Sequence, residues 1–273
     1  MNKLLRLYRL LNILSIDVAL GSICCAAWFA ELFNVDLRTY AFVSLGLTVW
    51  IIYTLDHLLD AKKIVGHAST ERHRFHQQYF KLLSIAVIFA VLADLFVVFF
   101  IRKAVFQSGM ALASVMIAYF LLHRFLKHFK EFVIAFLFSC GVMLPSWSIF
   151  RTIPSVDVSL IIAQFMITAL INLLLFSWFD RHCDSVDKRE SFVTLVGETV
   201  TQITIRILFA LNGLLIVLAA FAFPQVMNNV FIIFFMNVLL FILHSRPAIF
   251  EVNDRYRLLG DSIFFLPLLY YLM

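Results

Sequence analysis

The chain has 273 residues, of which 63% are hydrophobic and only 14% are charged. Soluble domains average roughly 45–50% apolar and about 25% charged residues, so this composition excludes a cytosolic enzyme, a secreted domain and a disordered chain. The sequence has only 8 Gly and lacks the alternating pattern of membrane strands, which argues against an outer-membrane barrel. Most of this protein is therefore expected to lie in lipid.

Nine stretches are long and apolar enough to be transmembrane helices, because crossing the hydrocarbon core takes about 20 residues. In chain order they are 11–33, 38–59, 80–101, 104–122, 132–150, 158–179, 203–223, 227–245 and 257–273. The first stretch follows basic residues, but its length and the spans after it favour a retained helix over a cleaved signal. Pro224-Gln225 with Asn228-Asn229 predicts the turn of a helical hairpin.

The basic residues predict how these helices cross the membrane. With the N-terminus in the cytoplasm, 18 of the 22 Lys and Arg face inward, and the outer side holds only Arg38, Arg102, Lys103 and Arg151. We therefore expect an all-α, polytopic protein of the cytoplasmic (inner) membrane, a nine-helix transmembrane bundle forming one domain over 1–273. The net charge of +5 then reflects inner loops and not nucleic-acid binding. The four Cys form no CxxC pair, so a zinc or redox motif has no support.

Two inner loops, about 60–79 and 180–202, are much longer than the others, and both begin with a pair of aspartates. Asp56 and Asp60 form the first pair, and Asp180 and Asp184 the second. Aspartates at i and i+4 lie on one helix face and repel each other, and acids at a helix C-terminus also oppose the macrodipole. A cation would relieve both costs. Carboxylates that share a site with phosphate are typical ligands of Mg²⁺.

Basic residues follow each pair and could bind phosphate. Arg72 and Arg74 follow the first pair, while Arg181, Lys188 and Arg189 surround the second. Arginine binds phosphate oxygens in a bidentate manner. The alternative is simple positive-inside anchoring, which applies equally to Lys62, Lys63, Lys188 and Arg189. Arg72 lies in the middle of its loop rather than at the end of a span, which favours a functional role.

The two acidic pairs resemble the motifs of the UbiA-type intramembrane prenyltransferases. That superfamily is a bundle of nine transmembrane helices with aspartate-rich motifs after helices 2 and 6. The second region, from Phe176 through Asp180, Asp184 and Ser191 to Gly197, matches the family layout without a gap. The first motif keeps Asp56 and Asp60, but Ile52-Tyr53 replaces its opening Asn-Asp. Glu190 stands where a basic residue is common.

The resemblance implies transfer of a prenyl group from an isoprenyl diphosphate to an aromatic or lipid acceptor inside the membrane. Mg²⁺ would be held by Asp56, Asp60, Asp180 and Asp184, and Arg72 would act with the metal on the leaving diphosphate. Asn172 would face the same cavity. We expect Arg74, Arg181 and Lys188 to bind substrate phosphate. Tyr53 and Trp178, each within a turn of a motif aspartate, would stabilise the carbocation.

Several other polar residues lie in or near the spans. Asp17 is expected to reach the same cavity or to pair with a basic side chain, and Asp94 has no evident partner. Asp261 is expected to pair with Arg255 or Arg257. The cluster Arg72-His73-Arg74-Phe75-His76 suggests phosphate contact or acid–base work. The chain has no HxxxH or HxxHH box, so a histidine-ligated iron site is disfavoured.

Two other functions remain open. The loss of the opening Asn-Asp favours a non-catalytic relative that binds polyprenyl phosphate or serves as a membrane scaffold, whereas the four retained aspartates favour the enzyme. A transporter would carry more charge at the bilayer midplane and more broken helices than this chain shows. The signature of the CDP-alcohol phosphotransferases is absent.

Overall fold

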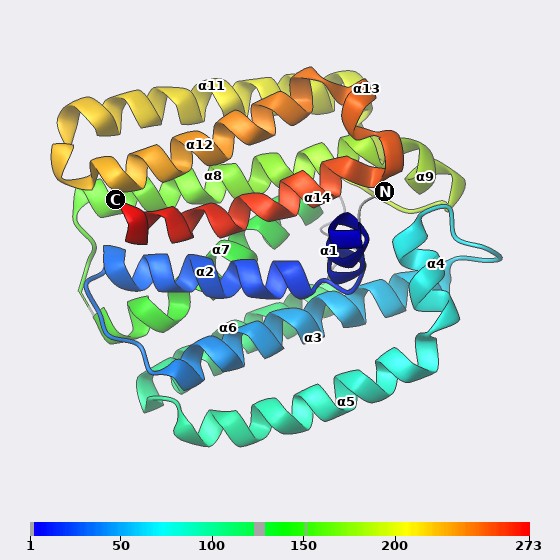
Figure 1. Ribbon diagram of the computed structural model, residues 1–273, viewed down its shortest axis with the longest axis horizontal. Helices are drawn as coiled ribbons and strands as arrows, with labels where there is room; N and C mark the ends of the chain where they lie inside the picture. Colours follow the sequence, from blue (N-terminus) through cyan, green and yellow to red (C-terminus); the bar gives the residue numbers. More distant parts are fainter. Residues whose placement is uncertain (1–2, 123–128, 151) are drawn as a thin grey trace.

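The computed structural model describes residues 3–122, 129–150 and 152–273, and within these ranges the chain is helical with no strand. The longer helices run side by side along the long axis of the molecule (Figure 1). The basic residues Arg124, Lys127 and Arg151, which entered the charge count, lie outside the described residues.

The first expected span contains a sharp bend. Helix α1 (Lys3–Ile13) meets α2 (Ile16–Leu32) at 84°, and Ser15 between them is in the left-handed conformation with φ 56°. The Trp50 indole donates a hydrogen bond of 2.9 Å to the Leu14 carbonyl, which fixes the bend against α3 (Thr39–Lys63). The apolar run 11–33 is therefore not one straight helix, and α1 lies across the end of the bundle (Figure 1).

The first acidic pair lies near the end of a long helix. Helix α3 (Thr39–Lys63) packs on α2 and on α5, and a loop leads from it to the short α4. The Thr70 side chain caps α4 by accepting from the His73 amide. The helices of this part of the chain are α4 (Glu71–Gln78), α5 (Phe80–Val97), η1 (Val98–Phe100) and α6 (Lys103–Leu122).

The second acidic pair lies at the end of the central helix. Helix α8 (Val156–Phe179) packs against α7 (Lys130–Phe150), α11 and α12, and its apolar side chains form much of the buried core. The predicted hairpin turn is confirmed by η3 between α11 and α12. The remaining elements are α9 (Arg181–Val186), α10 (Phe192–Val196), α11 (Glu198–Ala222), η3 (Pro224–Val226), α12 (Met227–Ser245), α13 (Pro247–Phe250), η4 (Val252–Asp254), α14 (Arg255–Ser262) and η5 (Ile263–Leu272).

Six helical segments in the described part of the chain are long and apolar enough to cross a membrane, and the bent pair α1–α2 would make a seventh. They are Thr39–Lys63, Phe80–Phe100, Lys130–Phe150, Val156–Phe179, Glu198–Ala222 and Pro224–Ser245. The two other expected spans, 104–122 and 257–273, are helical but are not among these segments. The count of nine and the cytoplasmic N-terminus remain predictions.

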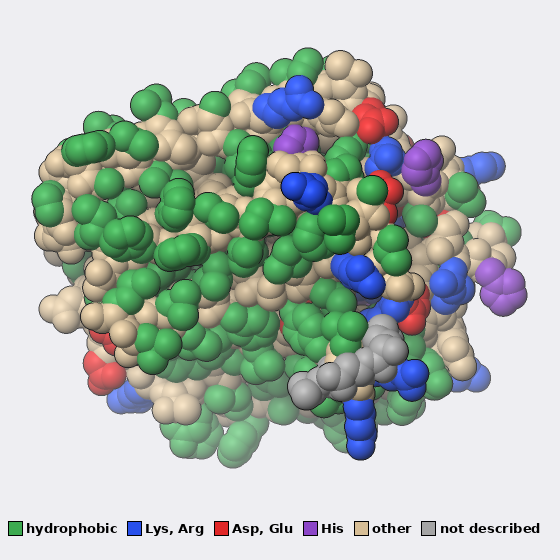
Figure 2. All heavy atoms as spheres, turned by 45° about the horizontal axis from the view of Figure 1, so that its top comes forward, with side chains coloured by type: hydrophobic (Ala, Val, Ile, Leu, Met, Phe, Trp, Pro, Cys, Tyr) green, Lys and Arg blue, Asp and Glu red, His purple; other side chains and the backbone are tan. Residues whose placement is uncertain are grey.

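The surface agrees with a multi-pass membrane protein. Helices α5 and α11 are among the least buried candidate spans, and apolar side chains such as Phe89, Phe96 and Phe221 are exposed on them. In the face seen in Figure 2, hydrophobic side chains cover most of the surface, and many of the charged ones gather toward one end. Lipid is the solvent that suits such a surface.

One glycine allows the last helices to approach the core closely. A Cβ on Gly260 of α14 would lie 2.4 Å from Phe176 and 2.7 Å from the Asn172 Oδ1 atom, both on α8. Real Cβ contacts are not that short, so a larger residue would push α14 away from α8. Gly213, on the exposed side of α11, meets no such neighbour within 4 Å.

We predict that Gly260→Ala destabilises the protein by about 2 kcal/mol, because overpacking forces α14 and α8 apart. Gly213→Ala is the matched control and should be neutral or slightly stabilising, since alanine is the better helix former. Thermal unfolding of both variants in the same detergent measures the difference. Equal melting temperatures for the two variants would contradict the predicted clash.

Candidate functional site

The two acidic pairs lie at the same end of the bundle, which we call the motif end. Asp56 and Asp60 lie in the last two turns of α3. Asp180 is the residue at which α8 ends, and Asp184 lies in α9, where its amide donates to the Asp180 carbonyl at 2.8 Å. Helices α4, α9 and α13 all lie at this end (Figure 1).

Arg189 connects the two pairs directly. Its Nη2 atom is 2.6 Å from Asp60 Oδ2, although the two residues are 129 positions apart. Its Nη1 atom is 3.2 Å from Asp184 Oδ1. One guanidinium therefore lies between a carboxylate of the first motif and a carboxylate of the second, and the expected meeting of the two motifs is seen.

A second contact joins the same two loops. The Asp187 carboxylate accepts hydrogen bonds from the Ser69 amide, at 3.1 and 3.2 Å, and from the Ser69 hydroxyl at 2.7 Å. Arg74 holds the first loop in place by donating to the carbonyls of Ala68 and Ser69. Arg74 thus supports the loop and points its guanidinium at backbone oxygens.

Local structure places Arg189. Lys188 adopts a left-handed conformation with φ 52°, and the Arg189 amide donates to the Asp184 carbonyl at 2.8 Å, so the chain turns back toward α9. Ser191 and Thr194 then form a capping box at the start of α10. The Glu131 carboxylate of α7 accepts from the Phe192 amide at 2.7 Å and fixes α10 to the bundle.

The negative charge of Asp180 is balanced by residues of α14. Its carboxylate accepts a hydrogen bond from the Tyr256 hydroxyl and forms an ion pair with Arg257, both on α14. The Tyr256 ring stacks on Phe179 with centroids 4.5 Å apart, and the Arg257 guanidinium lies 5.4 Å from the Phe176 ring centroid. Neither Tyr256 nor Arg257 was expected at Asp180 from the sequence, because no local spacing links α8 to α14.

Burial and neighbouring charge set the electrostatics of the loops. Burial raises the pKa of the Asp184 carboxyl, although the Arg189 guanidinium opposes the rise. Burial also acts to lower the pKa of Arg189, but Asp60 and Asp184 outweigh it and the pKa of Arg189 is raised. Arg189 is therefore a permanent positive charge at this position.

A second charged cluster is centred on Arg72 of α4. The buried Arg72 Nη2 donates to the Asn12 carbonyl at 3.0 Å and to Asn12 Oδ1 at 2.9 Å, and lies 3.7 Å from Asp261 Oδ2. Its Nη1 lies 3.4 Å from His57 Nε2. The guanidinium predicted to act on the diphosphate is thus already engaged with protein groups.

Asn12 also joins the two buried acids Asp17 and Asp261. Its Nδ2 atom donates to Asp17 Oδ2 at 2.6 Å and to Asp261 Oδ2 at 2.7 Å. The expected pairing of Asp261 with Arg255 or Arg257 is wrong, since Asp261 faces Arg72 and Asn12 while Arg257 pairs with Asp180. The arginine one helical turn away was the obvious partner, but α14 directs the two side chains to different neighbours.

Three histidines surround this cluster. The His57 ring centroid lies 5.2 Å from that of His76 and 6.0 Å from that of His73. His73 Nδ1 contacts the Thr70 hydroxyl at 2.6 Å, and His76 Nδ1 donates to the Arg72 carbonyl at 2.8 Å. Burial, together with the charges of Arg189 and Arg257, lowers the pKa of His73 to about 3. These rings are neutral, buried groups rather than exposed phosphate ligands.

The other predicted binding residues are spread over several places. Trp178 and Arg181 both contact Glu198 of α11. The Trp178 indole donates to Glu198 at 2.9 Å, while Arg181 pairs with Glu198 at 3.5 Å and Glu251 at 3.3 Å. Tyr53 is half-buried beside His57, Asn172 is buried against Gly260, and Lys188 is exposed.

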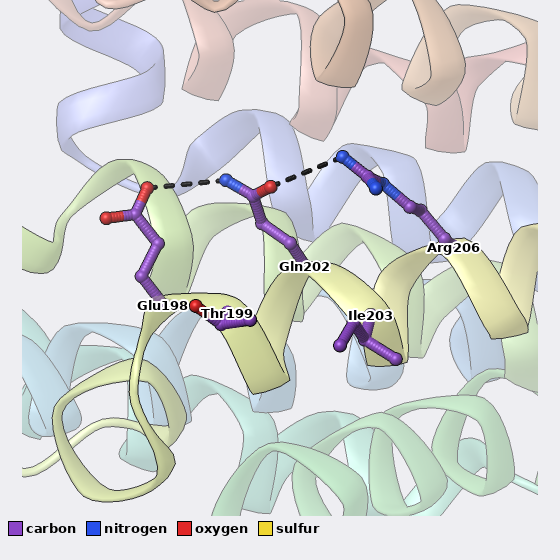
Figure 3. Close-up of a pocket in the computed structure, with 5 residues that line it drawn as sticks. All are labelled: Glu198, Thr199, Gln202, Ile203 and Arg206. Carbon is purple, nitrogen blue, oxygen red and sulfur yellow. Dashed lines mark hydrogen bonds between the residues drawn. The ribbon is translucent and has the colours of Figure 1, made fainter.

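Glu198 begins a polar strip on α11. Gln202 donates to Glu198 at 3.3 Å and accepts from Arg206 at 3.4 Å (Figure 3). With Thr199 and Ile203, these side chains line a surface hollow of about 230 Å³. Trp178 and Arg181 therefore contact the residue that begins this strip, Glu198.

Arginine side chains pair with most of the motif carboxylates. Within the described ranges, no three His, Cys, Asp or Glu side chains are grouped so as to hold a metal ion. Three of the four motif aspartates are instead engaged by arginine: Asp60 and Asp184 by Arg189, and Asp180 by Arg257. The donors are of the right kind for Mg²⁺, but guanidinium groups occupy their oxygens.

Comparisons with protein-family models, with curated proteins and with solved structures found no match to this chain. The function of the motif end is therefore inferred from the chemistry of its own residues and from the motif resemblance.

We predict that Arg72→Ala destabilises the fold by about 3–5 kcal/mol, because it leaves two buried carboxylates without their counter-ion. Arg74→Ala, an exposed change in the same helix, should cost about 1 kcal/mol or less. Chemical or thermal unfolding in detergent measures both. The double variant Arg72→Leu/Asp261→Leu should recover part of the loss, and equal losses in the two single variants would contradict this account.

We also predict that protonation of His73 weakens the fold in acid. The unfolded chain takes up this proton near pH 6.5 and the folded chain only near pH 3, so stability falls as pH drops through that window. His73→Gln should reduce the pH dependence by up to about 1.4 kcal/mol per pH unit. Unfolding measured from pH 7 to pH 4 tests this, with the exposed His67→Gln as control; identical slopes in wild type and His73→Gln would be the contrary result.

Proposed function

We propose that this chain binds an isoprenyl diphosphate at the motif end and transfers its prenyl group to an aromatic or lipid acceptor in the membrane. The observation that carries the proposal is the meeting of the two acidic motifs through Arg189. That meeting is what a shared diphosphate site requires, and it joins the two regions that resemble the UbiA-type enzymes.

The position of the site suits an amphiphilic substrate. The motif aspartates lie where apolar helices end and polar loops begin, so a lipid tail could lie among the helices while its charged head meets the loops. Arg189 and Arg257 lie beside the aspartates, and Lys63 is 3.4 Å from Asp60. Guanidinium groups bind phosphate oxygens through two parallel hydrogen bonds.

The proposed reaction breaks the allylic carbon–oxygen bond. The electron pair leaves with the diphosphate, whose growing negative charge is stabilised by the nearby arginines. A nucleophilic carbon of the acceptor attacks the prenyl cation and then loses a proton, so a carbon–carbon bond replaces the carbon–oxygen bond. The surrounding apolar helices exclude the water that would otherwise trap the cation. Mg²⁺ stays a prediction from the resemblance, and no step here depends on it.

A second candidate is a non-catalytic protein that binds polyprenyl phosphate or acts as a membrane scaffold. The arrangement of the carboxylates favours it, because Asp60, Asp180 and Asp184 are all paired with arginine. The replacement of the opening Asn-Asp of the first motif by Ile52-Tyr53 points the same way. Both candidates bind an isoprenoid that carries phosphate. They differ in whether the carbon–oxygen bond between the isoprenoid and its phosphate group is broken.

We predict that the purified chain in detergent binds geranylgeranyl diphosphate, and that Asp180→Asn weakens this binding at least about tenfold, or about 1.4 kcal/mol. The asparagine would no longer hold Arg257 in place. Asp157→Asn is the matched control, because Asp157 lies in the first turn of α8, at the end opposite Asp180. Binding is measured with and without Mg²⁺, followed by a search for released diphosphate.

Each result has a definite reading. Loss in Asp180→Asn but not in Asp157→Asn, with diphosphate released when an aromatic acceptor is added, supports the enzyme. The same loss without release supports the non-catalytic candidate. No saturable binding, or equal binding by wild type and both variants, would contradict both.

A further inference from the structure

Arg189 holds the place that a cation would take between the two acidic motifs. Its guanidinium uses separate nitrogen atoms for the two contacts, 2.6 Å to Asp60 Oδ2 and 3.2 Å to Asp184 Oδ1. The three side chains are largely removed from solvent, with exposed fractions of 23% for Arg189, 13% for Asp60 and 7% for Asp184. Charge pairs with so little exposure are screened much less than surface pairs.

The loop that carries Arg189 is held at several points, so the contact does not depend on one flexible side chain. The Arg189 amide donates to the Asp184 carbonyl, and the Thr194 hydroxyl donates to the Arg189 carbonyl at 3.3 Å. Asp187, two residues earlier, accepts from Ser69 in the opposite loop. Both the backbone of Arg189 and the neighbouring loop are therefore fixed near Asp60.

The first motif needs a positive charge at this position. Asp56 and Asp60 lie one turn apart near the C-terminal end of α3, so they repel each other and oppose the helix dipole. Lys63 also lies 3.4 Å from Asp60, but its side chain is 69% exposed and such pairs are worth little. Arg189, at 23% exposed, is better buried than Lys63.

We propose that Arg189 is a built-in counter-ion which replaces a divalent metal between Asp60 and Asp184. The fold of the motif end then needs no metal, and the two motifs are joined by a side chain of the protein itself. By pairing with both carboxylates, the guanidinium keeps a divalent cation from binding between them. Removing the guanidinium should therefore free Asp60 and Asp184 to share a divalent cation.

The experiment measures binding of Mn²⁺ alone to the full chain in detergent, by electron paramagnetic resonance of the free ion. Arg189→Gln should bind Mn²⁺ at least about tenfold more tightly than wild type. Lys188→Gln is the matched control, because it removes the same charge from the same loop at an exposed position, and it should resemble wild type. No isoprenoid is used, so this test can fail while the proposed function stands, and the reverse.

A second measurement keeps the proposal testable if Arg189→Gln is poorly folded. The melting temperature of the wild type should not change when EDTA or millimolar Mg²⁺ is added. Arg189→Gln should melt at a lower temperature and recover on adding Mg²⁺ or Mn²⁺, as ligand linkage requires. Arg189→Lys, which keeps the charge, should remain insensitive to the metals.

Three outcomes would overturn the proposal. Wild type could bind Mn²⁺ as tightly as Arg189→Gln, or be stabilised by Mg²⁺ to the same degree. Lys188→Gln could gain as much Mn²⁺ affinity as Arg189→Gln, which would point to the overall charge of the loop. Arg189→Gln could also fold without gaining any metal affinity.

Discussion

The motif end of this bundle depends on pairing charges that have been taken out of water. Asp17, Arg72 and Asp261 are each less than one-tenth exposed, and Asn12 connects all three. Leaving one of them without a partner would cost several kcal/mol. This requirement holds α1, α2, α4 and α14 in a fixed relation, and the neighbouring aspartates of α3 and α8 are positioned by the elements so fixed.

Two arginines from different parts of the chain divide the remaining acids between them. Arg189, from the loop after α9, serves Asp60 and Asp184, whereas Arg257, from α14, serves Asp180. The Arg189–Asp60 and Arg257–Asp180 ion pairs join elements that are distant in sequence, so these contacts form only when the helices of the bundle pack together. Where the outer surface of a bundle contacts lipid, the hydrophobic effect contributes little to the packing of one helix on another. Polar contacts such as these ion pairs therefore specify which helices pack together.

The helices themselves could be predicted from the sequence, because a helix that crosses lipid requires a long run of apolar residues. The hairpin at Pro224 and the shared location of the two acidic pairs followed from turn residues and from the parity of the spans. The bend at Ser15 could not be predicted, because a single serine within an apolar run does not indicate that its backbone is left-handed. The partners of individual charges were also hidden, because they depend on how side chains leave their helices.

Trp178 and Asp261 show this limit most clearly. Trp178 is two residues before Asp180, which made it a candidate for the same cavity. Side chains two positions apart on a helix point about 200° apart, however, and the Trp178 indole contacts Glu198. Asp261 is one turn from Arg257, but its partners come from Asn12 and Arg72, on α1 and α4. Sequence spacing alone gave the right helix ends and the wrong side-chain neighbours.

The link between Asn12 and Asp261 also has a consequence for the order in which the protein can assemble. The two residues are 249 positions apart, so nearly the whole chain is synthesised after Asp17 enters its helix and before Asp261 exists to complete the cluster. Chains are made from the N-terminus, and early segments fold while later ones are still missing. The charge cluster therefore stays incomplete until α14 has been synthesised, and a chain that stops before Asp261 cannot complete it.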